Sequence, residues 1–221
     1  MKNKGMQLGA VLAAMLLLGM VSIPAVSAQS DEKQVKQIDP YTYVVDKKVP
    51  DKKKFLDKIE PIIDREHNVS SSTGQVTSQD FDTSKSNTYS QNVLGSSIEG
   101  RTYAHGVQQS GWQATYTGDG YTKGYWWGSN PYYADRITLG SQVVVHGISV
   151  TVSVPPSIGF SVSGDTATYS GSWDNEWAAI HYYNNLVGTS NWALTGSDQY
   201  DSETFRFGNT DYTLYTHVAL P

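Results

Sequence analysis

The sequence predicts an all-β protein, built as an antiparallel β-sandwich, or as a jelly-roll-like or barrel arrangement, of about eight to ten short strands. Three observations support this fold class. From about residue 89 onward, side chains alternate with a period of two, and Gly, Thr, Ser, Tyr and Trp dominate. Turn residues separate the alternating runs, and no run in this part of the chain has a helical period.

The clearest strand spans residues 142–154, where the even-numbered positions are mostly apolar and include His146. We predict that this face lies in the core. The run is longer than a usual strand, which predicts a bulge or bend near Gly147. Shorter runs predict strands at residues 112–116, 121–127, 160–162, 166–170, 177–183, 191–194, 204–207 and 212–220.

Residues 1–28 have the pattern of a secretory signal peptide. Lys2 and Lys4 precede an apolar run, and small residues follow the helix-breaking Pro24, which predicts cleavage after Ala28 and a mature chain that begins at Gln29. The apolar run is shorter than the ~20 residues that a membrane-spanning helix needs. A secreted, extracellular protein is therefore expected, with no membrane association after the leader is removed.

The mature chain divides by composition. Residues 29–68 are rich in lysine and acidic residues, residues 69–92 are dominated by Ser, Thr, Gln and Asn, and residues 93–221 form the predicted β domain. In the first part, Asp51 is a candidate N-cap for one short amphipathic helix, which Pro61 is expected to kink or end near Glu60. The composition predicts that this charged segment is a partly helical or disordered spacer or pro-segment. It predicts that residues 69–92 are a linker.

Charge and cysteine content exclude several classes of protein. The chain has 16 basic and 21 acidic residues, and loss of the two leader lysines leaves 14 against 21, a net charge of −7. Such an acidic protein is a poor candidate for binding nucleic acid. The absence of cysteine excludes disulfides and thiolate metal sites.

Two carboxylates form the candidate catalytic pair. Asp174 and Glu176 lie between Trp173 and Trp177, and an i, i+2 spacing in an extended segment places both on one side. Glycoside hydrolysis uses two carboxyl groups about 5 to 9.5 Å apart, beside aromatic rings that hold the sugar. An exposed acidic turn would have the same sequence.

Candidate metal ligands form a second group. His146, His181 and His217 fall in alternating runs, so they could converge on a metal or could each be a core residue with one hydrogen bond. Oxygen donors in a short polar stretch suggest a calcium site or a solvated loop: Asp198, Asp201 and Glu203.

Aromatic residues are the most suggestive feature. Trp126, Trp127, Tyr132 and Tyr133 follow closely along the chain, and Trp192 lies beside Asn191. Neighbouring side chains on a strand point to opposite faces, so some of these rings should be exposed. Exposed rings near Asn and Ser are suited to stacking on sugars.

These observations lead to three functional hypotheses. The first is a noncatalytic extracellular protein that binds polysaccharide or the cell wall through exposed aromatic rings. The second is a secreted hydrolase of glycans or peptides that uses Asp174 and Glu176 or a histidine pair. The third is a secreted antagonist or toxin held inactive by its N-terminal segment. No common catalytic or cofactor motif is present.

Overall fold

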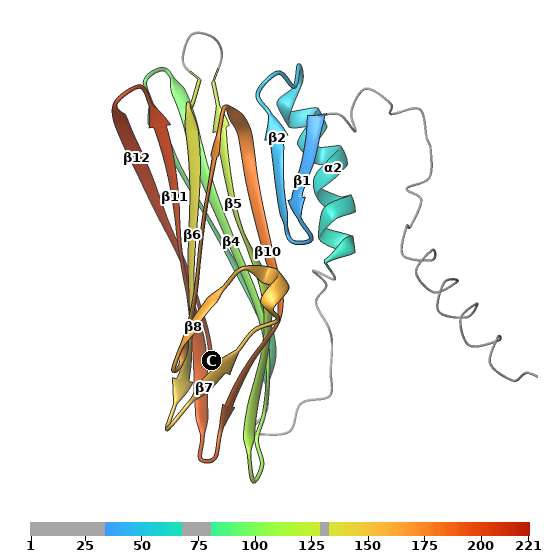
Figure 1. The fold of residues 1–221 in the computed structure, drawn as a ribbon, viewed down its shortest axis with the longest axis vertical. Helices are drawn as coiled ribbons and strands as arrows, with labels where there is room; N and C mark the ends of the chain where they lie inside the picture. Colours follow the sequence, from blue (N-terminus) through green and yellow to red (C-terminus); the bar gives the residue numbers. More distant parts are fainter. Residues whose placement is uncertain (1–33, 68–80, 129–132) are drawn as a thin grey trace, which may run out of the picture. The chain divides into compact units, whose positions relative to one another are not determined.

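The computed structural model describes residues 34–67, 81–128 and 133–221, which fold into two antiparallel sheets with one α-helix (Figure 1). Sheet A has the order β1 (Val35–Asp39), β2 (Thr42–Asp46), β10 (Glu176–Ser190), β5 (Ala114–Trp127), β4 (Ser96–Gln109) and β3 (Phe81–Val93), with the short β7 (Thr151–Ser153) paired to β10. Sheet B has the order β12 (Thr210–Leu220), β11 (Leu194–Phe207), β6 (Arg136–Gly147), β9 (Thr166–Asp174) and β8 (Ser161–Ser163). The predicted all-β sandwich is confirmed.

The core lies between the two sheets, and alternate residues of β6 point into it. Ile137, Leu139, Val143 and Val145 are each at most 1% exposed. Burial of such a side chain contributes about 1.5–3 kcal/mol. The buried positions of β6 are therefore odd-numbered, and the prediction that the even-numbered face with His146 is buried is wrong. Three consecutive valines carry no information on which face is inward.

The predicted strand over residues 142–154 is two strands in different sheets. A Cβ added at Gly147 would lie 2.3 Å from the carbonyl oxygen of Ala193, so glycine permits the close approach at which β6 ends. The chain then crosses to sheet A, where Val152 of β7 pairs with Gly188 of β10. The predicted bend near Gly147 is confirmed, and the single continuous strand is wrong. A 3-10 turn, η2 (Pro156–Ile158), follows β7.

The polar stretch predicted as a linker over residues 69–92 is a strand from Phe81 onward, whereas residues 68–80 lie outside the described part of the chain. This strand, β3, pairs with β4 along its whole length through a two-residue turn at Leu94 and Gly95, which both have positive φ. Its side chains are mostly exposed, because β3 is an edge strand held by its backbone ladder. Lys85 Nζ also donates to the carbonyl oxygen of Ala219 in β12 at 2.6 Å.

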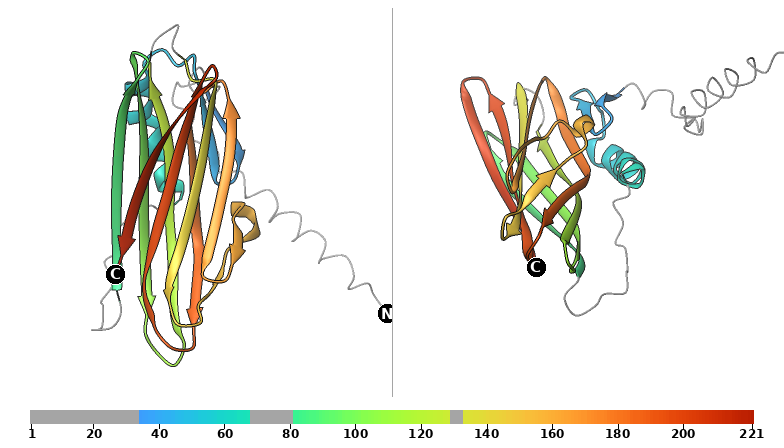
Figure 2. Two further views of the ribbon diagram at one scale, coloured as in Figure 1. Left: turned by 90° about the vertical axis from the view of Figure 1, so that its left-hand side faces the viewer. Right: turned by 60° about the horizontal axis from the view of Figure 1, so that its bottom comes forward.

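The predicted helix is confirmed as α2 (Lys52–Glu66), and Figure 2 shows it on the side of sheet A that faces away from sheet B. Asp51 caps it, because its Oδ1 accepts a hydrogen bond from the backbone N–H of Lys54 at 3.1 Å. The helix continues past Pro61 to Glu66, so the alternative that it ends near Glu60 is wrong. Contacts on both sides of the proline hold the helix, and its buried apolar residues are Phe55, Leu56 and Ile63.

The N-terminal segment contributes two strands that the sequence did not predict. β2 pairs with β10 and extends sheet A, and β1 pairs with β2. The charged segment therefore belongs to the same sheet as the β domain, rather than standing apart from it. The predicted leader at residues 1–28 lies outside the described residues. Among the helices that the structure describes, none combines the length and apolar content needed to cross a membrane.

Candidate functional site

Trp126 is a core residue, which contradicts the prediction that it is an exposed binding ring. Its side chain is 0% exposed, and its indole N–H donates to the carbonyl oxygen of Glu176 at 3.0 Å. The ring of Tyr133 packs edge-on against it at 5.1 Å, and Lys52 Nζ lies 3.7 Å from the ring centroid. Trp126 and Tyr133 thus anchor the packing near the start of α2.

Trp127 is also held inside the structure. It is partly buried, its indole N–H donates to Glu99 Oε2 at 3.1 Å, and its ring stacks on Tyr125 with centroids 6.1 Å apart. Tyr132 lies outside the described residues. The cluster that suggested sugar binding is therefore largely an internal aromatic cluster in the region that the structure describes.

Trp192 is exposed as predicted, and it has a counterpart that the sequence reasoning missed. Trp192 is 70% exposed in the turn between β10 and β11, and Trp112 is 99% exposed in the turn between β4 and β5. The two turns are neighbours because Ala114 pairs with Ser190. We call residues 109–114 and 190–194, together with Ile148, the loop end.

Hydrogen bonds join Ile148 to the turn at residues 190–194. Ser190 Oγ donates to the carbonyl oxygen of Ile148 at 2.5 Å and accepts from the backbone N–H of Trp192 at 3.0 Å. The backbone N–H of Ile148 donates to the carbonyl oxygen of Ala193 at 3.2 Å. Ile148 is itself 59% exposed, so three large apolar side chains reach solvent at the loop end.

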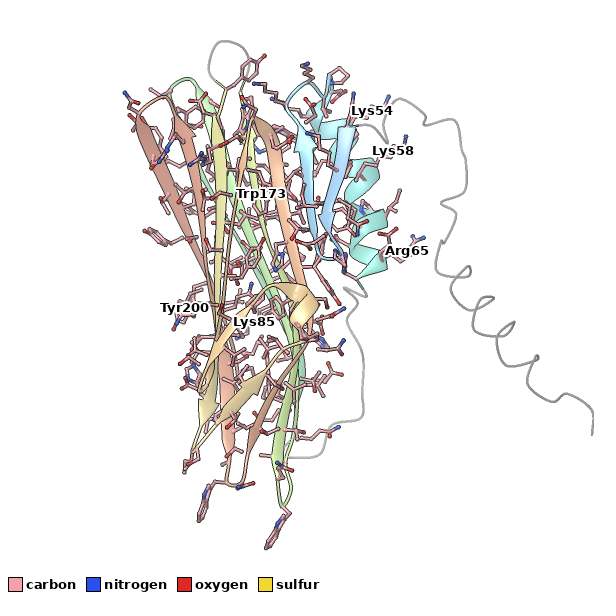
Figure 3. The ribbon with its side chains drawn as sticks, viewed as in Figure 1. Lys54, Lys58, Arg65, Lys85, Trp173 and Tyr200 are labelled. Atoms are coloured by element: carbon pink, nitrogen blue, oxygen red, sulfur yellow. The ribbon has the colours of Figure 1, made fainter. Side chains whose placement is uncertain are left out.

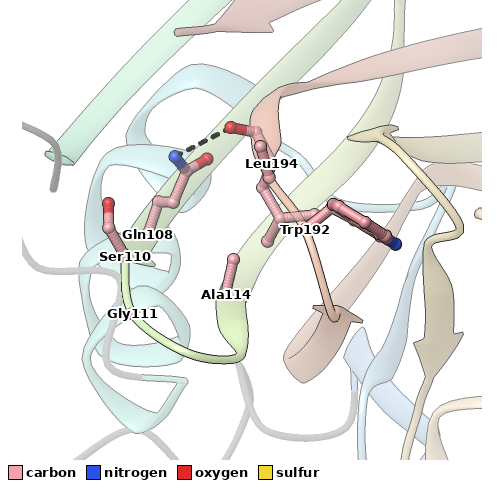
Figure 4. A pocket seen from close by; sticks show the side chains of 7 residues that line it. Gln108, Ser110, Gly111, Ala114, Trp192 and Leu194 are labelled. Atoms are coloured by element: carbon pink, nitrogen blue, oxygen red, sulfur yellow. Dashed lines mark hydrogen bonds between the residues drawn. The ribbon is translucent and has the colours of Figure 1, made fainter.

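A pocket of about 340 Å³ lies beside Trp192 (Figure 4). The Gln108 side chain crosses it, and its Nε2 donates to the carbonyl oxygen of Leu194 at 3.2 Å. The buried Gln108 Oε1 has no hydrogen-bond partner among the described residues. The lining contains no charged residue: Gln108, Ser110, Gly111, Ala114, Trp192, Ala193 and Leu194.

The two candidate catalytic acids lie in different sheets. Asp174 ends β9 in sheet B and Glu176 begins β10 in sheet A, on either side of a turn at Asn175 with φ +61°. Arg136 Nε donates to Asp174 Oδ1 at 2.6 Å, which lowers the pKa of this exposed carboxyl. Lys36 Nζ donates to Glu176 Oε1 at 2.7 Å. Each acid is therefore paired with its own cation.

The three candidate histidines do not converge. His146 and His217 both approach Asp198 on the outer face of sheet B, with Nε2 to carboxylate oxygen distances of 2.5 and 2.6 Å. His181 lies in sheet A, is 1% exposed and stacks on Tyr169 at 3.5 Å. Burial lowers the pKa of His181 to about 3, so its imidazole is neutral.

The candidate calcium ligands also point apart. Asp198 is on the outer face of β11, whereas Asp201 and Glu203 are 2% and 0% exposed and point between the sheets. Among residues 34–67, 81–128 and 133–221, no three His, Cys, Asp or Glu side chains are grouped to hold a metal. The alternation of β11 separates Asp198 from the other two acids.

Asp201 and Glu203 instead form a buried acid pair in a network of hydroxyl groups. The Thr102 hydroxyl donates to Asp201 Oδ2, and the Thr216 hydroxyl donates to Glu203 Oε1 at 3.2 Å. Burial raises the pKa of Asp201 to about 7 despite these hydrogen bonds. Burial and the neighbouring Asp201 carboxyl raise the pKa of Glu203 well above its usual range.

Comparisons with known proteins give no family. No protein-family model and no curated protein matches the chain. Among solved structures, the GAE domain of GGA2p from Saccharomyces cerevisiae is 10% identical, with a TM-score of 0.25, covering 61% of this chain and 98% of that one.

Two further structures are similar at the same low level. The first contains manganese lipoxygenase of Gaeumannomyces graminis and part of zonadhesin of Komagataella pastoris, at 9% identity, TM-score 0.24, and 58% and 65% coverage of the two chains. The second is a pore forming protein, at 8% identity, TM-score 0.18, and 62% and 90% coverage. TM-scores this low support no conclusion about function.

Proposed function

We propose that this protein is a secreted, noncatalytic binding protein whose loop end engages a neutral glycan of a polysaccharide or cell wall. The observation that carries the proposal is the 70% exposed Trp192 beside a pocket lined by uncharged residues. The leader predicted at residues 1–28 supports an extracellular location.

The chemistry of the loop end favours a neutral sugar. An exposed indole ring offers an apolar face to the C–H groups of a sugar, while amide and hydroxyl groups bind its hydroxyls. Gln108 and Ser110 supply such groups next to Trp192. Residues 106–118 and 186–197 contain no Asp, Glu, Lys or Arg, so the surface lacks partners for a strongly charged ligand.

A binding test follows from the exposure of the rings. Trp112→Ala and Trp192→Ala should each leave the melting curve nearly unchanged, because an exposed ring buries little surface. Retention on insoluble polysaccharide, tested on chitin, cellulose and cell walls of the producing organism, should fall about tenfold, since a stacking contact is worth on the order of 1–2 kcal/mol.

Tyr215→Ala is the matched control. Tyr215 is 76% exposed on β12, so its loss removes a comparable exposed ring away from the loop end. Equal losses for Tyr215→Ala and the two tryptophan variants would refute a specific site. Wild-type binding to phospholipid vesicles, with none to any of the polysaccharides, would show that the exposed rings are a membrane anchor and would contradict the glycan proposal.

A further inference from the structure

Lys123 is a fully buried cation on the outer face of sheet A. It lies on β5 and is 0% exposed. Its ammonium group lies 2.9 Å from Glu60 Oε1 and 2.8 Å from Asp64 Oδ1, both on α2. It also lies 3.8 Å from the centroid of the Tyr121 ring. The helix therefore covers the lysine with two carboxylates.

Other side chains of the sheet donate to the same two carboxylates. Glu60 accepts from Tyr125 Oη at 2.8 Å and from Arg101 Nη1 at 3.2 Å. Asp64 accepts from Tyr182 Oη at 2.5 Å. Burial opposes ionisation of Glu60, but Lys123, Tyr125 and Arg101 outweigh it and lower its pKa. Four donors from three strands thus form a receptor for oxyanions.

Such a receptor is an unexpected way to hold a permanent helix. Replacing a buried ion pair with apolar residues of similar volume is often neutral or stabilising. The same helix already uses apolar contacts through Phe55, Leu56 and Ile63. A sheet face with Lys123 and Arg101 beneath the helix is better suited to a protein with two states. In one state α2 covers the face, and in the other state the face binds an external anion.

The position of the covering segment in the fold permits its departure. In the described chain, β2 pairs only with β1 and β10, and β10 keeps its pairing with β5 and β7 when β2 leaves. Residues 34–67 precede every other described strand, so their departure breaks the ladder between β2 and β10 but no ladder between the remaining strands, and no strand has to be unthreaded.

We propose that the outer face of sheet A carries a second binding site, for an acidic polymer bearing carboxylate or phosphate groups, and that Glu60 and Asp64 occupy this site as an internal substitute for the ligand. The site is separate from the loop end and does not depend on the glycan proposal. Displacement of residues 34–67 opens it, and ligand binding competes with α2.

Removing the internal anions tests the proposal. Glu60→Gln with Asp64→Asn should bind polygalacturonate or polyphosphate at least tenfold more tightly than wild type in low-salt titration calorimetry, with neutral dextran as the blank. The two polymers distinguish carboxylate from phosphate recognition. Adding Lys123→Met should abolish the gain.

The matched control is Asp174→Asn with Asp211→Asn, which changes the net charge equally. Both acids are exposed. Asp174 pairs with Arg136, and Asp211 pairs with Arg206. Equal affinity of the control pair and the site pair for the polymers would overturn the proposal, because the effect would then come from net charge alone.

Wild-type protein provides a second measurement that requires no variant to fold. Lys54 and Arg65 are exposed on α2 and are substrates for trypsin once the helix is displaced (Figure 3). The acidic polymer that binds should accelerate cleavage at these residues several-fold relative to dextran. Unchanged cleavage at saturating concentrations of both polymers would contradict competition between ligand and α2.

Discussion

The buried carboxyl of Asp201 makes the stability of the protein depend on pH in a defined direction. Asp201 is 2% exposed, and burial raises its pKa from 3.8 to about 7. Between about pH 4 and pH 7, the unfolded chain has lost this proton while the folded chain still holds it. Folded-state stability therefore falls as pH rises through this window.

The magnitude follows from the width of the window. Roughly three pH units at about 1.4 kcal/mol each correspond to a loss on the order of 4 kcal/mol between pH 4 and pH 7. Asp201→Asn cannot ionise and should lack this loss. The wild type should therefore gain stability relative to the variant at acid pH and lose that gain by about pH 7.

Urea unfolding of both proteins at pH 4, 5, 6, 7 and 8 measures the difference directly. Asp211→Asn is the control, because Arg206 lowers the pKa of the exposed Asp211 and the sign of its contribution is opposite. Parallel pH profiles for wild type and Asp201→Asn would refute the account of a buried, protonated acid in the core.

Three further predictions concern packing and processing. Trp126→Ala should cost about 3–5 kcal/mol in urea unfolding, because Trp126 is fully buried, and a cost below about 1 kcal/mol would contradict its place in the core. Gly100→Ala should lower the free energy of unfolding by about 1–3 kcal/mol, because the new Cβ would lie 2.3 Å from Glu203 Oε2. In the control Gly111→Ala the new Cβ meets nothing closer than 3.8 Å, so this variant should be nearly neutral. Equal effects of the two substitutions would contradict this packing. Mass spectrometry of protein from culture medium should find Gln29 as the first residue, and an intact chain that begins at Met1 would contradict export.

The sequence was sufficient for the fold class and for the helix. Alternation with a period of two predicted the sandwich, and Asp51 followed by an apolar stripe predicted α2. It could not show the inward face of β6, because three consecutive valines fit either face. It could not show β3 either, because a strand held by its ladder at a sheet edge has the composition of a linker.

The site was harder to predict because exposure depends on long-range contacts. Trp126 and Trp192 were equal candidates, yet only Trp192 is exposed. A local signal does distinguish them: Ser190 and Asn191 mark a turn before Trp192, whereas Trp126 is flanked by aromatic strand residues. The ion pairs of Lys123 join residues about sixty positions apart, and no local pattern reports them.

The claim that the loop end binds the ligand is tested most directly by nuclear magnetic resonance of the six tryptophan indole groups. The protein is titrated with a soluble fragment of the polysaccharide that retains it, and Trp112→Phe and Trp192→Phe assign the two signals. We expect the Trp112 and Trp192 indole N–H signals to shift, while those of the fully buried Trp126 and Trp177 stay in place. Binding that shifts neither the Trp112 nor the Trp192 signal would contradict the account.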